Sequence, residues 1–171
     1  MKRLRATLLL VALTAATAVP AAGQADRVTP SGLPVPRWVS LKFDKVYARA
    51  GPGEDHRLLW AYRVKNLPVQ VVEETADWRR VCDPEGGRAW VHKRTTDGRR
   101  TAMNLRVADM PLRARAGEDA KPRAFWVQRS LGSLDECSGA WCRVKVEGVS
   151  GWAPRNSIWG VQEAAVCGRR R

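Results

Sequence analysis

The chain has 171 residues, and its 30 lysines and arginines against 17 aspartates and glutamates give a formal net charge of +13. This length suits one or two domains. Beyond an N-terminal apolar stretch, no segment approaches the ~20 apolar residues that a membrane-spanning helix needs. These features exclude a protein of many domains and a polytopic membrane protein.

The N-terminus has the order of segments found in a secretory signal peptide. A basic start over residues 1–5 precedes an uncharged apolar stretch over 6–19. That stretch is too short for a membrane span, and small residues follow it, so we expect cleavage after Ala22 or Ala25. The protein is then periplasmic or secreted, with no transmembrane segment after cleavage. Residues 26–36 contain three prolines and a glycine, which predicts an extended lead-in.

Five or six short strands are expected after the lead-in, separated by turns that contain glycine, asparagine or aspartate. The expected strands cover residues 38–42, 46–50, 58–62, 67–74, 78–82 and 88–92. Short strands at this spacing, with no long helical period between them, are typical of an all-β sandwich or barrel.

The second half of the chain repeats the first. Trp78-Arg79-Arg80-Val81, a glycine turn and Ala89-Trp90 return as Trp141-Cys142-Arg143-Val144, a glycine turn and Gly151-Trp152. The repeated unit has ~60 residues, the size of one small β-barrel domain. Phe125-Trp126-Val127 is matched with Leu59-Trp60-Ala61.

The fold class predicted is therefore all-β, with two tandem small barrels. The expected organisation is a signal peptide over 1–25, a lead-in over 26–36, repeat 1 over 37–96, a linker over 97–105, repeat 2 over 106–161 and a basic tail over 162–171.

The four cysteines allow two disulfides. Cys137 and Cys142 flank a tight turn between two predicted strands, which brings them close enough to bridge, and an oxidising compartment would preserve the bond. Cys82 and Cys167 are left over, and a second bridge would tie the C-terminal tail to repeat 1. Free thiols are the alternative for both pairs.

The aromatic residues have two interpretations. Trp78, Trp90, Trp141 and Trp152 are expected in the cores, because large indoles close small β-domains well. For ligand binding we single out the three aromatics whose strands are least fixed by the repeat pattern, with ordinary packing as the alternative. These are Tyr47, Trp60 and Trp126.

Catalysis is not expected. The chain has only two histidines, His56 and His92, and only a pairing of His92 with Cys82 would suggest a nucleophile and base. The sequence has no clustered metal ligands and no phosphate-binding loop, so no enzyme activity, metal or cofactor is expected.

One stretch resembles a known family. Val46-Tyr47-Ala48-Arg49-Ala50-Gly51-Pro52-Gly53 is similar to the signature that opens bacterial SH3-like domains, although that family commonly has asparagine in place of Tyr47. The tryptophan motifs of both repeats resemble the family's closing strands, and repeat 2 lacks the Gly-Pro-Gly turn. The resemblance implies a small, strongly bent barrel of five or six strands that serves as an envelope or secreted binding module.

The function expected is that of a non-catalytic exported SH3-like binding protein, whose partner is cell-wall peptidoglycan or an envelope protein. The positive charge would attract anionic polymers without specificity. In the alternative interpretation, the arginines only keep the exposed faces of the strands solvated. Export argues against nucleic acid as the partner. The alternative function is a structural or assembly factor that presents a sheet edge to a protein partner.

Overall fold

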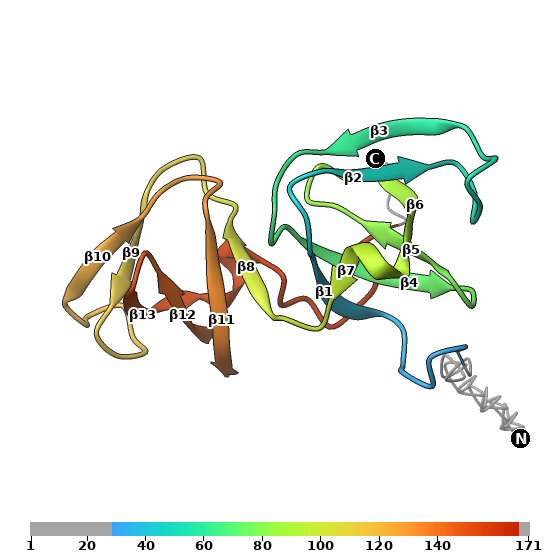
Figure 1. The fold of residues 1–171 in the computed structure, drawn as a ribbon. Coiled ribbons are helices and arrows are strands. Elements are labelled where there is room, and N and C mark those ends of the chain that lie inside the picture. Colours follow the sequence, from blue (N-terminus) through green and yellow to red (C-terminus); the bar gives the residue numbers. More distant parts are fainter. Residues whose placement is uncertain (1–28, 168–171) are drawn as a thin grey trace, which may run out of the picture.

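Strands form almost all of the regular structure in the computed structural model, which describes residues 29–167 (Figure 1). The expected signal peptide lies outside the described residues. Repeat 1 contains β1 (Arg37–Leu41), β2 (Val46–Arg49), β3 (Leu58–Tyr62), β4 (Pro68–Glu74), β5 (Trp78–Cys82), β6 (Arg88–His92), the 3-10 helix η1 (Lys93–Thr95) and β7 (Thr96–Asp97). Repeat 2 contains β8 (Thr101–Asn104), β9 (Met110–Arg113), β10 (Pro122–Trp126), β11 (Leu131–Ser138), β12 (Trp141–Val146), β13 (Val149–Pro154), η2 (Arg155–Ser157) and β14 (Ile158–Trp159).

The two repeats have the same topology. The first sheet has the strand order β3-β2-β6-β5-β4-β1-β7, and the second has the order β10-β9-β13-β12-β11-β8-β14. Each strand of the second sheet therefore takes the place of the strand seven earlier in the chain. The all-β prediction and the internal duplication are both confirmed.

The segment expected to be a linker, 97–105, is mostly strand. Asp97 belongs to β7, and Thr101–Asn104 form β8, which pairs with β11 and β14 inside the second sheet. All four residues of β8 are buried. Because both faces are covered, β8 has no alternation of apolar and polar residues that would mark it as a strand. Only residues 98–100 separate the two sheets.

Each repeat has its own core, built from the inward-facing residues of its strands. In β12 the alternation is regular: Cys142, Val144 and Val146 are buried, and the residues between them face outward. The strand β4 differs because its first four residues are all buried. One face of β4 packs in the core of repeat 1, and residues from the C-terminal part of the chain cover the other.

Trp159 joins the two repeats. It lies on the last strand of repeat 2 but packs in the core of repeat 1, where its indole N–H donates to the Pro68 carbonyl at 2.7 Å. The ring of Trp38 meets it edge-on, with 5.0 Å between the ring centroids, and donates from its own N–H to the carbonyl of Gln162 at 2.8 Å. The repeats therefore share buried side chains rather than only a linker.

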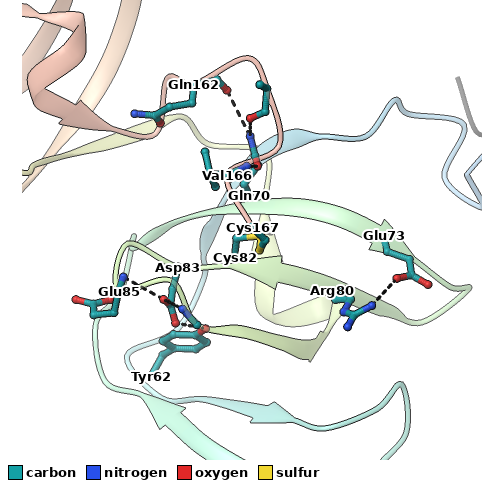
Figure 2. Close-up of a disulfide and its surroundings, with 12 residues drawn as sticks. Tyr62, Gln70, Glu73, Arg80, Cys82, Asp83, Glu85, Gln162, Val166 and Cys167 are labelled. Carbon is teal, nitrogen blue, oxygen red and sulfur yellow. Dashed lines mark hydrogen bonds and ion pairs between the residues drawn. A yellow bond between two sulfur atoms is a disulfide. The ribbon is translucent and has the colours of Figure 1, made fainter. Parts of the chain in front are cut away.

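After Trp159 the chain crosses back over repeat 1 (Figure 2). The fully buried side chain of Gln70 holds this segment from both sides: its amide N–H donates to the Ala164 carbonyl at 2.9 Å, and its amide oxygen accepts from the Val166 N–H at 2.8 Å. Cys167 then forms a disulfide with Cys82. Residues 164–167, expected as part of a basic tail, thus lie on the surface of repeat 1, whereas Glu163 pairs with Arg155 of repeat 2.

The predicted disulfide between Cys137 and Cys142 is also present. Cys137 and Cys142 stand directly opposite each other on β11 and β12, with 4.0 Å between their Cα atoms. The turn between them is closed by Ser138 and Trp141, and Gly139 has a positive φ of 54° that a residue with a side chain rarely adopts. The two bridges differ in the length of chain that they enclose, 85 residues against 5.

The lead-in is fixed to repeat 1 by a buried carboxylate. Glu74 accepts hydrogen bonds from the backbone and hydroxyl of Ser31 and pairs with Arg37, while the Nε atom of Arg79 lies 3.6 Å away. The Glu74 side chain is only 2% exposed. Burial alone would raise its pKa, but the hydrogen bonds from Ser31 and Arg37 outweigh this and lower the pKa from 4.5 to about 2.

The Glu74 contacts should make folding sensitive to acid. Because the folded-state pKa is below the unfolded value, the stabilisation is complete above about pH 4.5 and is lost as the pH falls towards 2. We expect the difference in unfolding free energy between wild type and Glu74→Gln to shrink by about 3 kcal/mol over that range. Urea unfolding at a series of pH values measures this. Glu73→Gln, which removes a partly exposed ion pair with Arg80, is the matched control and should change the unfolding free energy by at most about 1 kcal/mol. A pH-independent effect of Glu74→Gln would contradict the account.

The two disulfides should contribute unequally to stability. The chain-entropy model gives about 4.6 kcal/mol for the loop closed by Cys82 and Cys167 and about 2 kcal/mol for the one closed by Cys137 and Cys142. Double Cys→Ser variants of each pair, compared by urea unfolding without reductant, test this. Equal losses for the two pairs would show that the C-terminal segment does not close the long loop in solution.

Candidate functional site

Each repeat has a surface hollow at the same place in its sheet. In both, the hollow is lined by the first residue of the fifth strand, the last residue of the sixth strand and an acidic residue of the loop between the second and third strands. In repeat 1 these residues are Trp78, His92 and Glu54, and in repeat 2 they are Trp141, Pro154 and Glu118. We name the hollows groove 1, of about 370 Å³, and groove 2, of about 560 Å³.

Groove 1 has an aromatic lining. Phe43 from the β1–β2 connection, Tyr47 from β2 and Trp78 from β5 all contribute to it, and Phe43 and Tyr47 are each 46% exposed. Trp78 is opposite His92 in the β5–β6 ladder, and the two rings meet edge-on with centroids 5.2 Å apart. The His92 ring is itself fixed, because its Nδ1 accepts from the backbone N–H of Arg94 at 3.1 Å.

Groove 1 also has an excess of positive charge. Lys45, Arg49 and Arg94 line it, against the single carboxylate of Glu54. None of these three cations forms an ion pair with an acidic side chain in residues 29–167. The ammonium of Lys45 lies 4.9 Å from the centre of the Tyr47 ring and, through its hydrogen bond and charge, lowers the pKa of the Tyr47 hydroxyl.

The loop that closes one side of each groove is held by an equivalent arginine. Arg49 donates to the carbonyl of His56 at 2.9 Å, and Arg113 donates to the carbonyl of Ala120 at 2.8 Å. In repeat 1 the His56 ring packs against Gly51, where a Cβ atom would lie 2.5 Å from the ring. The loop of repeat 2 lacks the Gly-Pro-Gly turn but keeps the arginine contact.

Groove 2 differs from groove 1 in its charges. Trp141, Pro154 and Val161 give it apolar walls. Its Glu118 carboxylate pairs with Arg113 at 3.1 Å, and the guanidinium of Arg155 pairs with Glu163 at 2.6 Å. The same fold position therefore carries unpaired cations in repeat 1 and compensated charges in repeat 2.

The two grooves have the same geometry because both repeats match the same protein family. The family model described as "Bacterial SH3 domain" matches residues 42–98 and again residues 106–160, together more than half of the chain. The chain belongs to the bacterial SH3 domain family. Both grooves are therefore surfaces of bacterial SH3 repeats, and the resemblance seen in the sequence is confirmed.

Two solved structures share some similarity with these SH3 repeats. "NlpC1 from Trichomonas vaginalis" is 10% identical, with 77% of this chain and 49% of that chain covered and a TM-score of 0.35. "NlpC2 from Trichomonas vaginalis" is 9% identical, with 72% and 48% covered and a TM-score of 0.33. The chain spans about half the length of these proteins. No curated protein matches the sequence.

The SH3 fold separates the three aromatics singled out in the sequence. Tyr47 lines groove 1. Trp60 pairs with Ala48, which is a core residue next to Tyr47 in β2, so Trp60 and Tyr47 are on opposite faces of the hairpin. Trp126 has no exposed surface and donates from its indole N–H to the Ser130 carbonyl. The ligand-binding prediction for Trp126 is corrected, because a side chain without exposed surface has no contact with a ligand.

Trp126 was also matched with the wrong residue of repeat 1. It pairs with Met110 as Tyr62 pairs with Val46, so its counterpart is Tyr62 rather than Trp60.

The SH3 grooves contain two tryptophans that sequence reasoning assigned to the cores. Trp78 and Trp141 are only half-buried and line grooves 1 and 2. Trp152 is also half-buried, and Trp90 alone of the four is buried as expected. Recurrence of Trp78 and Trp141 at the same place in the duplicated motif was the one signal in the sequence that could have identified them as a shared surface feature.

Cys82 and His92 are not brought together in repeat 1. Cys82 is in a disulfide and stands opposite Arg88 in the β5–β6 ladder, whereas His92 stands opposite Trp78 at the other end of that ladder. Within residues 29–167 we also find no group of three or more potential metal ligands arranged around a common point, and no helix with the length and apolar character to cross a membrane.

Proposed function

We propose that this chain is a non-catalytic, exported binding protein whose groove 1 takes a carboxylate-bearing peptide of the cell wall. The observation that carries the proposal is the combination of three exposed or half-buried aromatics with three cations that lack acidic partners. Peptide stems of the wall carry carboxylates, and a ligand of that kind supplies the negative charge that groove 1 lacks.

The chemistry of groove 1 suits such a ligand in two respects. Arg49 and Arg94 present guanidinium groups, which bind carboxylates with two parallel hydrogen bonds. Tyr47 and Trp78 present broad apolar surfaces with a polar edge, which contact peptide planes and sugar rings at low cost in side-chain entropy. The two sets of groups together favour a ligand that is both extended and anionic.

Two features support a location outside the cytoplasm. The N-terminal sequence has the order of a signal peptide. The two disulfides are of the kind that persists in oxidising compartments. Export and cell-wall binding are part of the same proposal, since peptidoglycan lies outside the inner membrane.

The absence of catalysis is also proposed. The Cys82 sulfur is held in a disulfide and is therefore not available as a nucleophile. Groove 1 contains one imidazole, His92, which uses its Nδ1 to accept the Arg94 N–H. Binding, rather than bond cleavage, is the activity that these groups support.

The alternative, an assembly factor that presents a sheet edge to a protein, has one supporting observation. Strands β3 and β10 each end a sheet and pair on one side only. An exposed edge of this kind is a template for a partner strand. A stoichiometric protein partner isolated from envelope extracts, lost when proline replaces Leu59, would favour this alternative.

Wall binding is tested by sedimentation of the purified protein with insoluble peptidoglycan. We expect the double variant Lys45→Glu/Tyr47→Ala to bind at least about tenfold more weakly, because it reverses one charge and removes one aromatic face of groove 1. Lys65→Glu is the matched control, since Lys65 is exposed and outside groove 1. If both variants bound equally weakly, the effect would come from the change in net charge and not from groove 1. If the wild type did not sediment with peptidoglycan, wall binding would be refuted.

A further inference from the structure

One end of repeat 2 exposes large apolar side chains to solvent. Val107 is 89% exposed, Phe125 63%, Val127 54% and Leu105 39%. We call these four residues the apolar end of repeat 2. Isolated exposed apolar residues are common in soluble proteins, but a group of them at one place marks an interaction surface.

The four residues are brought together by two neighbouring loops. Leu105 and Val107 lie in the β8–β9 connection, and Val127 lies in the β10–β11 connection that follows Phe125. The two connections run side by side at the same end of the repeat (Figure 1). The backbone N–H of Gln128 in one loop donates to the Asp109 carboxylate of the other at 3.1 Å.

A buried asparagine fixes both loops. Asn104 is fully buried, and its side-chain amide donates to the carbonyls of Trp126 at 2.8 Å and Ala108 at 3.3 Å. Its amide oxygen accepts from the backbone N–H of Arg106 at 2.9 Å. The interior of the two loops is thus occupied by polar contacts, and their apolar side chains face outward.

Repeat 1 is built differently at this position. Leu41 occupies the place of Asn104, because the two residues have equivalent backbone hydrogen bonds. The Leu41 N–H donates to the Leu67 carbonyl, and the Leu41 carbonyl accepts from the Asn66 N–H. In repeat 2 the Asn104 N–H donates to the Ser130 carbonyl, and the Asn104 carbonyl accepts from the Arg129 N–H. Leu41 is a core residue. The corresponding loops of repeat 1, 42–45 and 63–65, contain four lysines and arginines. These loops also expose Phe43 and Val64, 46% and 45%, but less than Val107 and Val127 at 89% and 54%. The apolar end of repeat 2 is therefore more exposed, and has fewer cations within its loops, than the corresponding end of repeat 1.

Two cations flank the apolar end. Arg106 lies within the first loop and Arg123 lies on β10, two residues from Phe125; both are exposed. Neither forms an ion pair within residues 29–167. Lysines and arginines outnumber acidic residues by 30 to 17 in the whole chain, and only three of these cations lie in the expected signal peptide, so an anionic surface attracts the molecule as well as these two side chains.

We propose that the apolar end of repeat 2 docks on an anionic phospholipid surface. Val107 and Val127 enter the headgroup region, and Arg106 and Arg123 contact lipid phosphates. Two observations favour a lipid surface over a protein. The most exposed apolar side chains are on loops at the end of the barrel, and they line neither groove 1 nor groove 2. A projecting apolar group flanked by two unpaired cations is complementary to a negatively charged bilayer.

The test is co-sedimentation of the purified protein with vesicles. On vesicles of phosphatidylethanolamine and phosphatidylglycerol we expect binding of the wild type that weakens as salt is added, and little binding on phosphatidylcholine alone. Val107→Asp/Val127→Asp should lower the partition coefficient at least about tenfold, since it replaces the inserted groups with charges that the lipid repels.

Leu58→Asp/Val64→Asp is the matched control. Both residues are exposed apolar residues of repeat 1, 47% and 45%, outside groove 1, and the change in charge is the same. It should reduce binding much less than the repeat 2 variant. The milder Val107→Ser, at an almost fully exposed position, should reduce binding severalfold with an unchanged circular dichroism spectrum.

Three outcomes would overturn the proposal. The first is no binding of the wild type to phosphatidylglycerol vesicles. The second is equal weakening by the repeat 2 variant and its control. The third is a dimer in sedimentation velocity that Val107→Ser abolishes, because the apolar end would then be an interface between two copies of the chain.

Discussion

The insertion of Trp159 into repeat 1 is the contact on which the arrangement of the two repeats depends. Repeat 2 ends with this residue, and its buried indole N–H binds a carbonyl of β4 while its ring packs against Trp38. The chain then continues across β4, where Gln70 and the Cys82–Cys167 bridge hold it. Small domains bury only a modest core, and here repeat 1 gains two core residues, Met103 and Trp159, that repeat 2 supplies.

Duplication of the fold has not duplicated the surface. The two sheets have the same strand order, and the arginine that holds the groove loop is present in both as Arg49 and Arg113. The side chains above this common frame differ: groove 1 keeps cations without acidic partners, groove 2 has its charges paired, and the loops of repeat 2 expose the larger apolar surface. A core leucine in one copy, Leu41, is the loop-holding Asn104 in the other. The repeats are therefore suited to different contacts.

More of the fold than of the candidate site could be predicted from the sequence. Strand alternation, glycine turns and the repeated tryptophan motif predict two all-β units, and four cysteines behind a signal-peptide pattern predict the two bridges. The strand β8 was not predicted, because both of its faces are buried and its residues show no alternation of apolar and polar side chains. The mistaken match of Trp126 to Trp60 followed residue type, whereas the pairing of β9 with β10 depends on hairpin register, which sequence shows only indirectly. Groove 1 joins Phe43 to Arg94 across several strands, a long-range proximity that no local pattern reports.

The central functional claim is that groove 1 is the site of ligand binding. The most direct measurement is an NMR titration of the ¹⁵N-labelled protein with a soluble peptidoglycan stem peptide, followed at the backbone amides and the indole N–H groups. The account predicts that the shifts concentrate at Tyr47, Trp78 and Arg94 and that the Trp141 indole in groove 2 is unaffected. Shifts confined to groove 2, or no shifts at ligand concentrations in the millimolar range, would contradict it.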